Sequence, residues 1–247
     1  MAFSEIQTSA SPLAPGLDAY ADQQMLLGDC GATTIIDVGA NVGNTVEKYF
    51  YMFPAATIHA FEPDPDTFSV LKQRFEPHPR VRCWCSAVSS QSRREPFFVN
   101  QDAGTNSLLP RPSQGRRYYN KLGVLRREIE VTATTLDDFC RDQGVTSLDV
   151  LKLDIQGGEL LALQGAGGLL TAQAVKVVYS EVQFTPLYEH APLFHDVCAF
   201  LESKGYSLYG LYDLVAASNG QLRFADAIFI PQSVRESVLD GFPEEPY

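Results

Sequence analysis

The sequence lacks several features that would place the protein in a specialised class. Its five cysteines form no Cys-x-x-Cys pair and no cluster with the spacing of a zinc site. We interpret Cys83 and Cys85 as small apolar side chains in a reducing compartment. No apolar run approaches the roughly 20 residues that a transmembrane helix needs, and the first residues show no signal peptide. We therefore expect a cytoplasmic protein with no membrane partner.

Basic residues are also scarce. Lys and Arg total 19 against 30 for Asp and Glu, which gives a formal net charge of −11. This balance argues against nonspecific binding to nucleic acid or to an anionic membrane surface. The length of 247 residues and the apolar content of 45% suit one large domain with a substantial core.

Residues 33–45 carry the most informative pattern. A short apolar run with β-branched residues predicts a buried parallel strand; it ends at Asp-Val-Gly, 37–39, and a glycine-containing turn and a helical pattern follow. A dinucleotide site of the form Gly-x-Gly-x-x-Gly would need glycine where Asn41 and Asn44 stand. The Asp37 carboxylate would repel a pyrophosphate but could sit near a cationic ligand. S-adenosylmethionine is such a ligand, because it carries an ammonium and a sulfonium and no phosphate.

A second acid ends the next predicted strand, 57–62. A carboxylate at this place in a doubly wound sheet typically holds ribose hydroxyls, because it can accept hydrogen bonds from two adjacent hydroxyl groups. We therefore predict a ribose contact for Glu62, and the alternative is a solvent-facing acid at a strand end. His59 on the same strand is more simply a packed core histidine than a catalyst.

Two further acids end neighbouring predicted strands, 148–155 and 175–182. Asp154 could hold the cationic part of the cofactor, orient an acceptor hydroxyl or bind a metal. Together with Glu181 it could chelate Mg²⁺ or act as an acid–base pair. A metal is possible but not favoured, because no third ligand is clearly placed. Lys152 is expected to point away from the neighbours of Asp154, since strand sides alternate, and its partner is not readable.

The loops supply the remaining candidates. His190, in the aromatic-rich connection 183–195, is the histidine best placed for general-base work. The segment 101–128 is basic in an acidic chain; it could be a mobile cover with arginines for an anionic acceptor, or a solvated loop, which we favour slightly. Thr135 is expected to cap a helix, with the acids that follow it near the positive end of the helix dipole.

Alternating strands and helices predict an α/β fold with a Rossmann-like, doubly wound, seven-stranded and mostly parallel sheet. A turn at 217–220 joins the last two strands as a hairpin, so the last strand is reversed. A short strand at 95–99 should pair with one at 129–134. We expect an N-terminal arm and helix over 1–30, one domain over 31–235 and a loose tail over 236–247. The seven strands are expected at 33–38, 57–62, 81–88, 148–155, 175–182, 206–212 and 224–230.

Four ordered segments resemble the FkbM family of class I S-adenosylmethionine-dependent methyltransferases: DVGANVGN, FEPDPDTF, LKLDIQGGE and ADAIFI. The resemblance spans most of the chain and implies that domain 31–235 methylates a hydroxyl of a sugar or natural-product small molecule. It also implies that Ser86 and Ala87 line the adenine and that Asn106 lies near the cofactor. The commoner family form has Glu where Gln156 stands.

Asp154, Glu181 and His190 are the catalytic candidates, in that order for presence at the site. Two alternatives remain open: a nicotinamide-dependent oxidoreductase, disfavoured by the missing glycines, and a non-catalytic relative, disfavoured by the strand-end acids. The expected cofactor contacts are Asp37, Gly39, Ala40, Asn41, Gly43, Glu62, Ser86, Ala87, Asn106 and Asp154.

Overall fold

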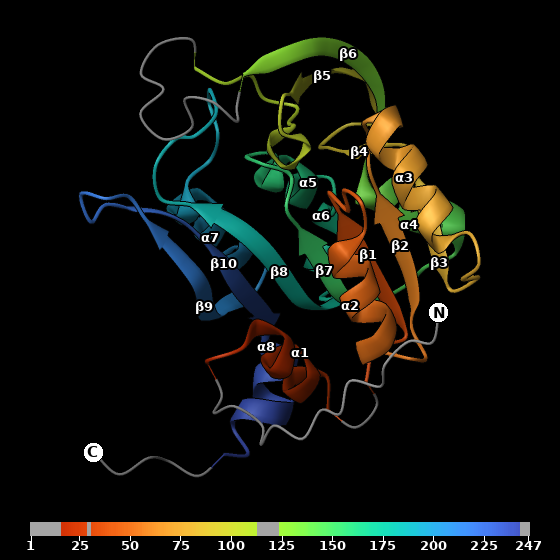
Figure 1. Ribbon diagram of the computed structural model, residues 1–247. Helices are drawn as coiled ribbons and strands as arrows, with labels where there is room; N and C mark the ends of the chain where they lie inside the picture. Colours follow the sequence, from red (N-terminus) through yellow and green to blue (C-terminus); the bar gives the residue numbers. More distant parts are fainter. Residues whose placement is uncertain (1–15, 29–30, 113–123, 243–247) are drawn as a thin grey trace, which may run out of the picture.

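The computed structural model describes residues 16–28, 31–112 and 124–242. The expected N-terminal arm, the middle of the basic segment and the end of the expected tail lie outside these residues. Within the described ranges, strands and helices alternate along the chain and form an α/β fold (Figure 1). None of the described helices is long and apolar enough to cross a membrane.

A seven-stranded sheet forms the centre of the fold, in the order β3-β2-β1-β7-β8-β10-β9. β10 is antiparallel to both of its neighbours, and every other neighbouring pair is parallel. The predicted doubly wound sheet with a reversed last strand is therefore confirmed. Its strands are β1 (Thr34–Val38), β2 (Thr57–Phe61), β3 (Val81–Trp84), β7 (Leu148–Leu153), β8 (Val175–Gln183), β9 (Tyr206–Ala216) and β10 (Leu222–Pro231).

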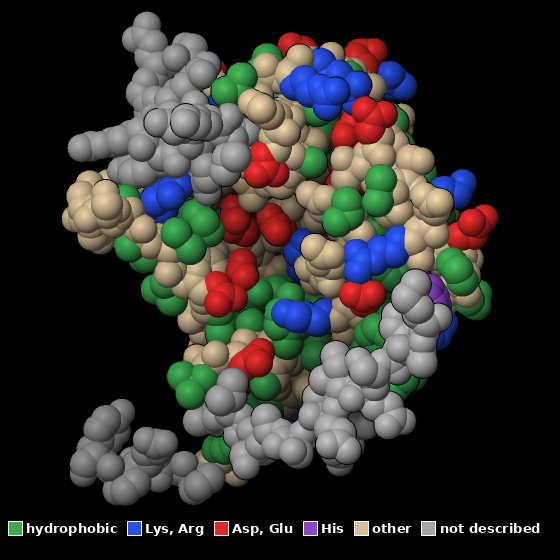
Figure 2. Space-filling model, in the orientation of Figure 1, with side chains coloured by type: hydrophobic (Ala, Val, Ile, Leu, Met, Phe, Trp, Pro, Cys, Tyr) green, Lys and Arg blue, Asp and Glu red, His purple; other side chains and the backbone are tan. Residues whose placement is uncertain are grey.

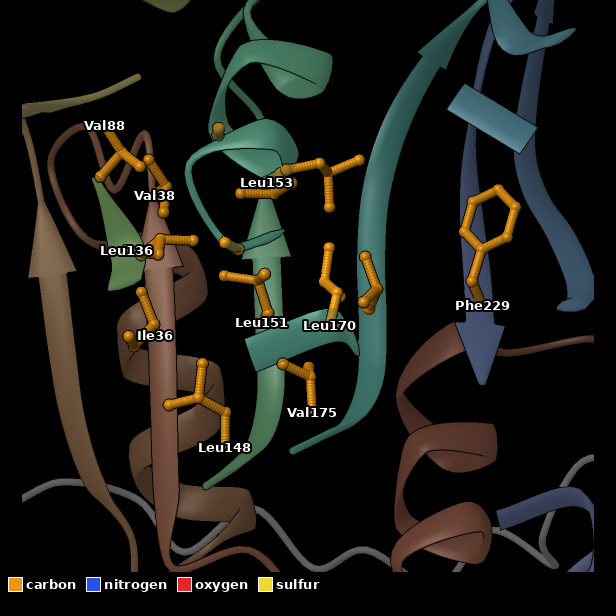
Figure 3. Packing of buried hydrophobic residues seen from close by; sticks show 14 of the residues in the cluster. Ile36, Val38, Val88, Leu136, Leu148, Leu151, Leu153, Leu170, Val175 and Phe229 are labelled. Atoms are coloured by element: carbon orange, nitrogen blue, oxygen red, sulfur yellow. The ribbon is translucent and has the colours of Figure 1, made fainter. Parts of the chain in front are cut away.

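Helices cover both faces of this sheet (Figure 1). One apolar cluster joins α4, α5, α6 and α7 to one face, and a second joins α1, α2, α3 and α8 to the other. In Figure 3, Leu136 and Leu170 from the first helical layer lie against Ile36 and Leu151 of the sheet. The helices are α1 (Ala19–Leu27), α2 (Asn44–Met52), α3 (Pro65–Phe75), α4 (Leu136–Gln143), α5 (Glu159–Gln164), α6 (Gly167–Thr171), α7 (Phe194–Glu202) and α8 (Gln232–Val234).

The central strand β7 shows why its sequence reads as a nearly continuous apolar run. All six residues, Leu148–Leu153, are buried, because helices cover both faces. Leu151 packs in the first cluster and Val150 in the second. Asp149 and Lys152 are the exceptions, two buried charged side chains in an otherwise apolar strand.

A second, three-stranded sheet lies beside the carboxyl ends of the large one, in the order β4-β6-β5. It comprises β4 (Ala87–Val88), β5 (Arg93–Asn100) and β6 (Leu125–Thr134). The expected pairing of 95–99 with 129–134 is confirmed as the antiparallel β5–β6 ladder. The expected single strand 81–88 is wrong: it leaves the large sheet after Trp84, and Ala87 and Val88 pair with β6 instead.

The predicted helix cap at Thr135 is confirmed, because its side chain accepts a hydrogen bond of 3.0 Å from the Asp138 backbone N–H.

Thr135→Ala should lower the free energy of unfolding by about 1 kcal/mol, since the first turn of α4 loses its acceptor. Urea denaturation measures the loss. Thr146→Ala, at an exposed position, is the matched control and should change stability by less than about 0.5 kcal/mol. Equal effects of the two substitutions would contradict the capping role.

Candidate active site

A cavity opens at the carboxyl ends of β1, β2 and β7, where the order of the sheet reverses. The small sheet and the following 3₁₀ turn, Ala103–Thr105, close one side of it. Most of the predicted cofactor residues line it: Gly39, Asn41, Glu62, Ser86, Ala87, Asn106 and Asp154.

Gly39 lies where the end of β1 comes closest to the segment that follows β7. Its φ of 78° is left-handed, and a Cβ there would lie 1.9 Å from the Asp154 carbonyl oxygen. The Gly39 and Ala40 N–H groups both donate to the Phe61 carbonyl, at 3.1 and 2.9 Å. Glycine is therefore required for the end of β1 to pass between its two neighbours. Ala40 is buried in this turn and does not line the cavity.

Gly43 also lies outside the cavity lining, at the start of α2. Its φ is 89°, and a Cβ would lie 2.3 Å from the Phe75 ring of α3. The glycine therefore allows α2 and α3 to pack closely.

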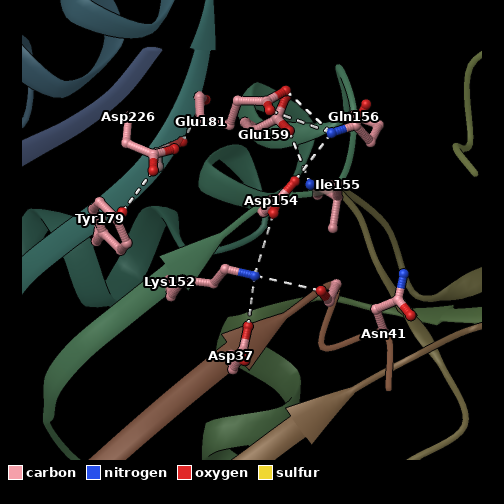
Figure 4. A network of polar contacts seen from close by, with 12 residues as sticks. Asp37, Asn41, Lys152, Asp154, Ile155, Gln156, Glu159, Tyr179, Glu181 and Asp226 are labelled. Atoms are coloured by element: carbon pink, nitrogen blue, oxygen red, sulfur yellow. Dashed lines mark hydrogen bonds and ion pairs between the residues drawn. The ribbon is translucent and has the colours of Figure 1, made fainter. Parts of the chain in front are cut away.

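Asp37 is fully buried and does not face the cavity directly. Its Oδ1 lies 2.9 Å from the Lys152 Nζ, which also donates to the Gly39 carbonyl at 3.4 Å and lies 3.7 Å from Asp154 Oδ2 (Figure 4). Burial raises the pKa of Asp37, and the Lys152 charge opposes that rise. Burial also opposes the Lys152 charge, but Asp37 and Asp154 outweigh it and raise the pKa of Lys152. The expectation that Lys152 points away from the neighbours of Asp154 is wrong. Side chains two residues apart on a strand lie on the same side, so Lys152 and Asp154 face the same way.

Glu62 lies directly after β2, as predicted, and only 5% of its surface is exposed. Its two oxygens accept hydrogen bonds from the Asn41 and Asp64 backbone N–H groups, at 3.0 and 2.9 Å. Each carboxylate oxygen has a second lone pair, so both can still accept from a ligand. Burial raises the pKa of Glu62 to about 7. The solvent-facing alternative for Glu62 is wrong.

Ser86, Ala87 and Asn106 lie on the side of the cavity formed by the small sheet. The Ser86 hydroxyl donates to the Thr132 carbonyl at 3.0 Å, which joins this corner to β6. The Asn106 Oδ1 accepts from the Asn100 N–H at 2.8 Å. These contacts fix the loops, and the small side chain of Ala87 leaves room beside its backbone for a flat ring.

Asp154 and Glu181 are brought together, as expected for ends of adjacent strands. The Gln156 Nε2 donates to Asp154 Oδ1 at 3.1 Å and to the two Glu181 oxygens at 3.2 and 3.3 Å (Figure 4). Burial raises the pKa of Glu181, and the neighbouring acids, Asp154 first, raise it further. Asp154 and Gln156 line the cavity, and Glu181 lies behind the amide.

His190 is not brought to this site. It is exposed on the loop before α7, has a φ of 59° and does not line the cavity. The buried aromatic residue of this loop is Tyr188, whose hydroxyl lies 2.9 Å from Gln156 Oε1. The sequence pattern identified the loop correctly but not the residue that points inward.

Three contributions were missed by reasoning from the sequence: the partner of Lys152, the bridging amide of Gln156 and the Tyr179–Asp226 contact, in which the phenol donates to Asp226 Oδ2 at 2.6 Å. A lysine between two leucines near the carboxyl end of a central strand was the available signal for the first. No group of three or more His, Cys, Asp and Glu side chains within the described ranges is arranged to hold a metal ion.

The strand order, the reversed strand and the position of the cavity define a class I methyltransferase fold. The FkbM methyltransferase domain matches residues 37–208, which is more than half of the chain. The chain therefore belongs to the FkbM methyltransferase family, whose members use S-adenosylmethionine.

Curated relatives agree with this assignment. The 2-O-methyltransferase NoeI of Sinorhizobium fredii is 29% identical over 160 residues, which cover 63% of this chain and 65% of that protein. The 31-O-demethyl-FK506 methyltransferase FkbM of Streptomyces tacrolimicus is 29% identical over 152 residues, covering 53% and 58%. The match thus spans less than two thirds of either relative.

Among solved structures, a TehB-like methyltransferase from Corynebacterium glutamicum superimposes with a TM-score of 0.41 and 13% identity, covering 85% of this chain and 87% of that one. The two curated relatives are methyltransferases by name, and the nicotinamide alternative gains no support from them.

Removing the Lys152 charge should destabilise the protein, because Asp37 would be left buried without its partner. We expect Lys152→Met to lower the free energy of unfolding by about 3–5 kcal/mol, measured by urea denaturation. The double variant Asp37→Leu/Lys152→Met should recover most of that loss, since replacing both members of a buried pair by apolar residues is often neutral. A double variant no more stable than the single one would show that the pair is not the cause.

Proposed function

We propose that the chain transfers the methyl group of S-adenosylmethionine to a hydroxyl oxygen of a sugar or natural-product small molecule. The main support for this proposal is the cavity at the ends of β1, β2 and β7, where Glu62 and Asp154 lie around the glycine turn. Family membership and the names of the relatives, a 2-O-methyltransferase and a 31-O-demethyl-FK506 methyltransferase, support oxygen as the methylated atom. We place the methyltransferase domain at 31–235, which contains the matched residues 37–208.

The residues of the cavity suit each part of the cofactor. Glu62 would accept hydrogen bonds from the ribose hydroxyls, and Ala87 with Ser86 would lie beside the adenine. Gly39 and Asn41 would bring backbone close to the ligand. Asp154 is the cavity carboxylate nearest to Lys152 and would face the cationic end. When bound, S-adenosylmethionine supplies an electrophilic methyl group on its sulfonium.

The acceptor hydroxyl must lose a proton as its oxygen bonds to the methyl carbon. We propose Asp154 as the first candidate for the base, because it lines the cavity, and Glu181 as the second. The raised pKa of Glu181 gives its ionised form a stronger affinity for a proton than an ordinary carboxylate has. Because His190 is exposed and outside the cavity, we propose no role for it.

The activity itself has a direct test. Incubation of the protein with S-adenosylmethionine and a panel of sugars and polyketide alcohols should yield S-adenosylhomocysteine and an O-methylated product, detected by mass spectrometry. The deoxy analogue of each productive acceptor is the control and should give no product. Methylation of the deoxy analogues, or of amines alone, would contradict transfer to a hydroxyl oxygen.

The pKa of Glu62 makes cofactor binding depend on pH. With a pKa of about 7 in the free protein, Glu62 becomes protonated as the pH falls below 7 and loses acceptor capacity for the ribose. The dissociation constant of S-adenosylhomocysteine, measured by calorimetry, should therefore rise about tenfold per unit in the acid limb. Glu62→Gln should bind weakly and with little pH dependence, whereas Glu76→Gln, at an exposed position, should retain it. An unchanged dissociation constant in Glu62→Ala would reject the ribose contact.

A further inference from the structure

Gln156 connects the Asp154 carboxylate, which lines the cavity, with the Glu181 carboxylate behind it. Its amide nitrogen has two hydrogens, and its contacts of 3.1 Å to Asp154 and 3.2 Å to Glu181 allow one hydrogen for each acid (Figure 4). Both carboxylates can therefore be held without a proton shared between them. A side chain of similar shape but without N–H groups would leave the acids facing each other unsatisfied.

The other end of the amide is fixed by Tyr188. The phenol oxygen lies 2.9 Å from Gln156 Oε1 and 3.0 Å from the Thr105 carbonyl, so its one hydrogen can be donated to either, and it accepts a hydrogen bond from Arg111 at 2.8 Å. The hydroxyl donor at one end and the carboxylate acceptors at the other determine which way the amide points. The Gln156 backbone has a φ of 58°, an uncommon conformation for a residue other than glycine, and such conformations concentrate at functional sites.

The surroundings of this bridge are strongly acidic. Asp226 is the direct cross-strand partner of Glu181, and like charges in that relation are unfavourable. Glu159 starts α5 nearby and accepts from the Ile155 and Gly157 N–H groups, both at 2.9 Å. Acidic side chains gather in a hollow over β8 in Figure 2. Burial and these acids raise the pKa of Glu181, and the hydrogen bond from Gln156 opposes the rise.

We propose that Gln156 is a positioning residue that holds the Asp154 carboxylate at the cavity, with the Glu181 carboxylate behind it, and thereby makes the site prefer the cationic methyl donor to the neutral product. S-adenosylmethionine carries a sulfonium charge, and S-adenosylhomocysteine carries an uncharged thioether in its place. A carboxylate pair in a partly buried site interacts with a positive charge far more strongly than it would in water. The product, which lacks that charge, loses this attraction and leaves more easily. This inference rests on the proposed function.

The test is the ratio of two dissociation constants, measured by calorimetry on the full chain with S-adenosylmethionine and with S-adenosylhomocysteine. In Gln156→Leu, the ratio of the product constant to the donor constant should fall about tenfold, because donor binding loses hydrogen-bonded charge while product binding changes little. Gln164→Leu, at the exposed end of α5, is the matched control and should leave the ratio unchanged.

A second variant separates the effect of losing the amide bridge from the effect of straining the backbone at position 156. Asparagine accepts the left-handed conformation well, but its amide is one methylene shorter and cannot span both acids. Gln156→Asn should therefore fold and still show the lower ratio, which keeps the test valid if Gln156→Leu does not fold. Equal weakening of both ligands, or an unchanged ratio in a folded variant, would overturn the positioning role. Failure of the wild-type chain to bind either ligand would instead overturn the proposed function.

Discussion

A buried lysine and aspartate, paired across two central strands, constrain the rest of the site. Asp37, Lys152 and Tyr179 occupy neighbouring register positions on β1, β7 and β8. Two residues earlier, the same strands carry the apolar core residues Ile35, Val150 and Val177. Buried apolar residues are therefore followed by a buried ion pair only two residues further along the same strands. Because either charge alone would be costly to bury, the pair favours the observed register of β1 against β7 over any alternative.

This pairing changes the meaning of the first acid in the glycine turn. An acid before a glycine turn suggests direct contact with a cationic ligand, yet the Asp37 carboxylate is occupied by Lys152. The same ammonium contacts the Gly39 carbonyl and approaches Asp154. Asp37 therefore acts through the lysine: it fixes the lysine, which in turn fixes the turn and the carboxylate that borders the cavity. The need for glycine at position 39 has the same origin, since β1 and the segment after β7 are held in close contact there.

The sequence predicts what depends on local periodicity and misses what depends on loop conformation. Apolar runs located the central strands, Thr135 marked a helix start, and the turn at 217–220 indicated the reversed strand. Strand-end position placed Glu62 and Asp154 at one cavity, because parallel strands end at one edge. The Gln156 bridge could not be foreseen, because it requires a positive φ that no local pattern signals. His190 was misplaced for the same reason, since loop composition does not say which side chain turns inward.

The charges at the carboxyl edge explain why this fold suits a positive ligand. Asp154 directly follows β7, and Glu181 and Asp226 lie on the next two strands, β8 and β10. The hydrogen bonds of Gln156 and Tyr179 stabilise these acids without adding positive charge. Lys152 is directed mainly toward Asp37, at 2.9 Å, and only at 3.7 Å toward Asp154. A pyrophosphate would add negative charge to this edge, whereas a sulfonium or ammonium would offset it. Burial first and the neighbouring acids second raise the pKa of Glu181 in the free protein, and a cationic methyl donor would relieve the repulsion among those acids.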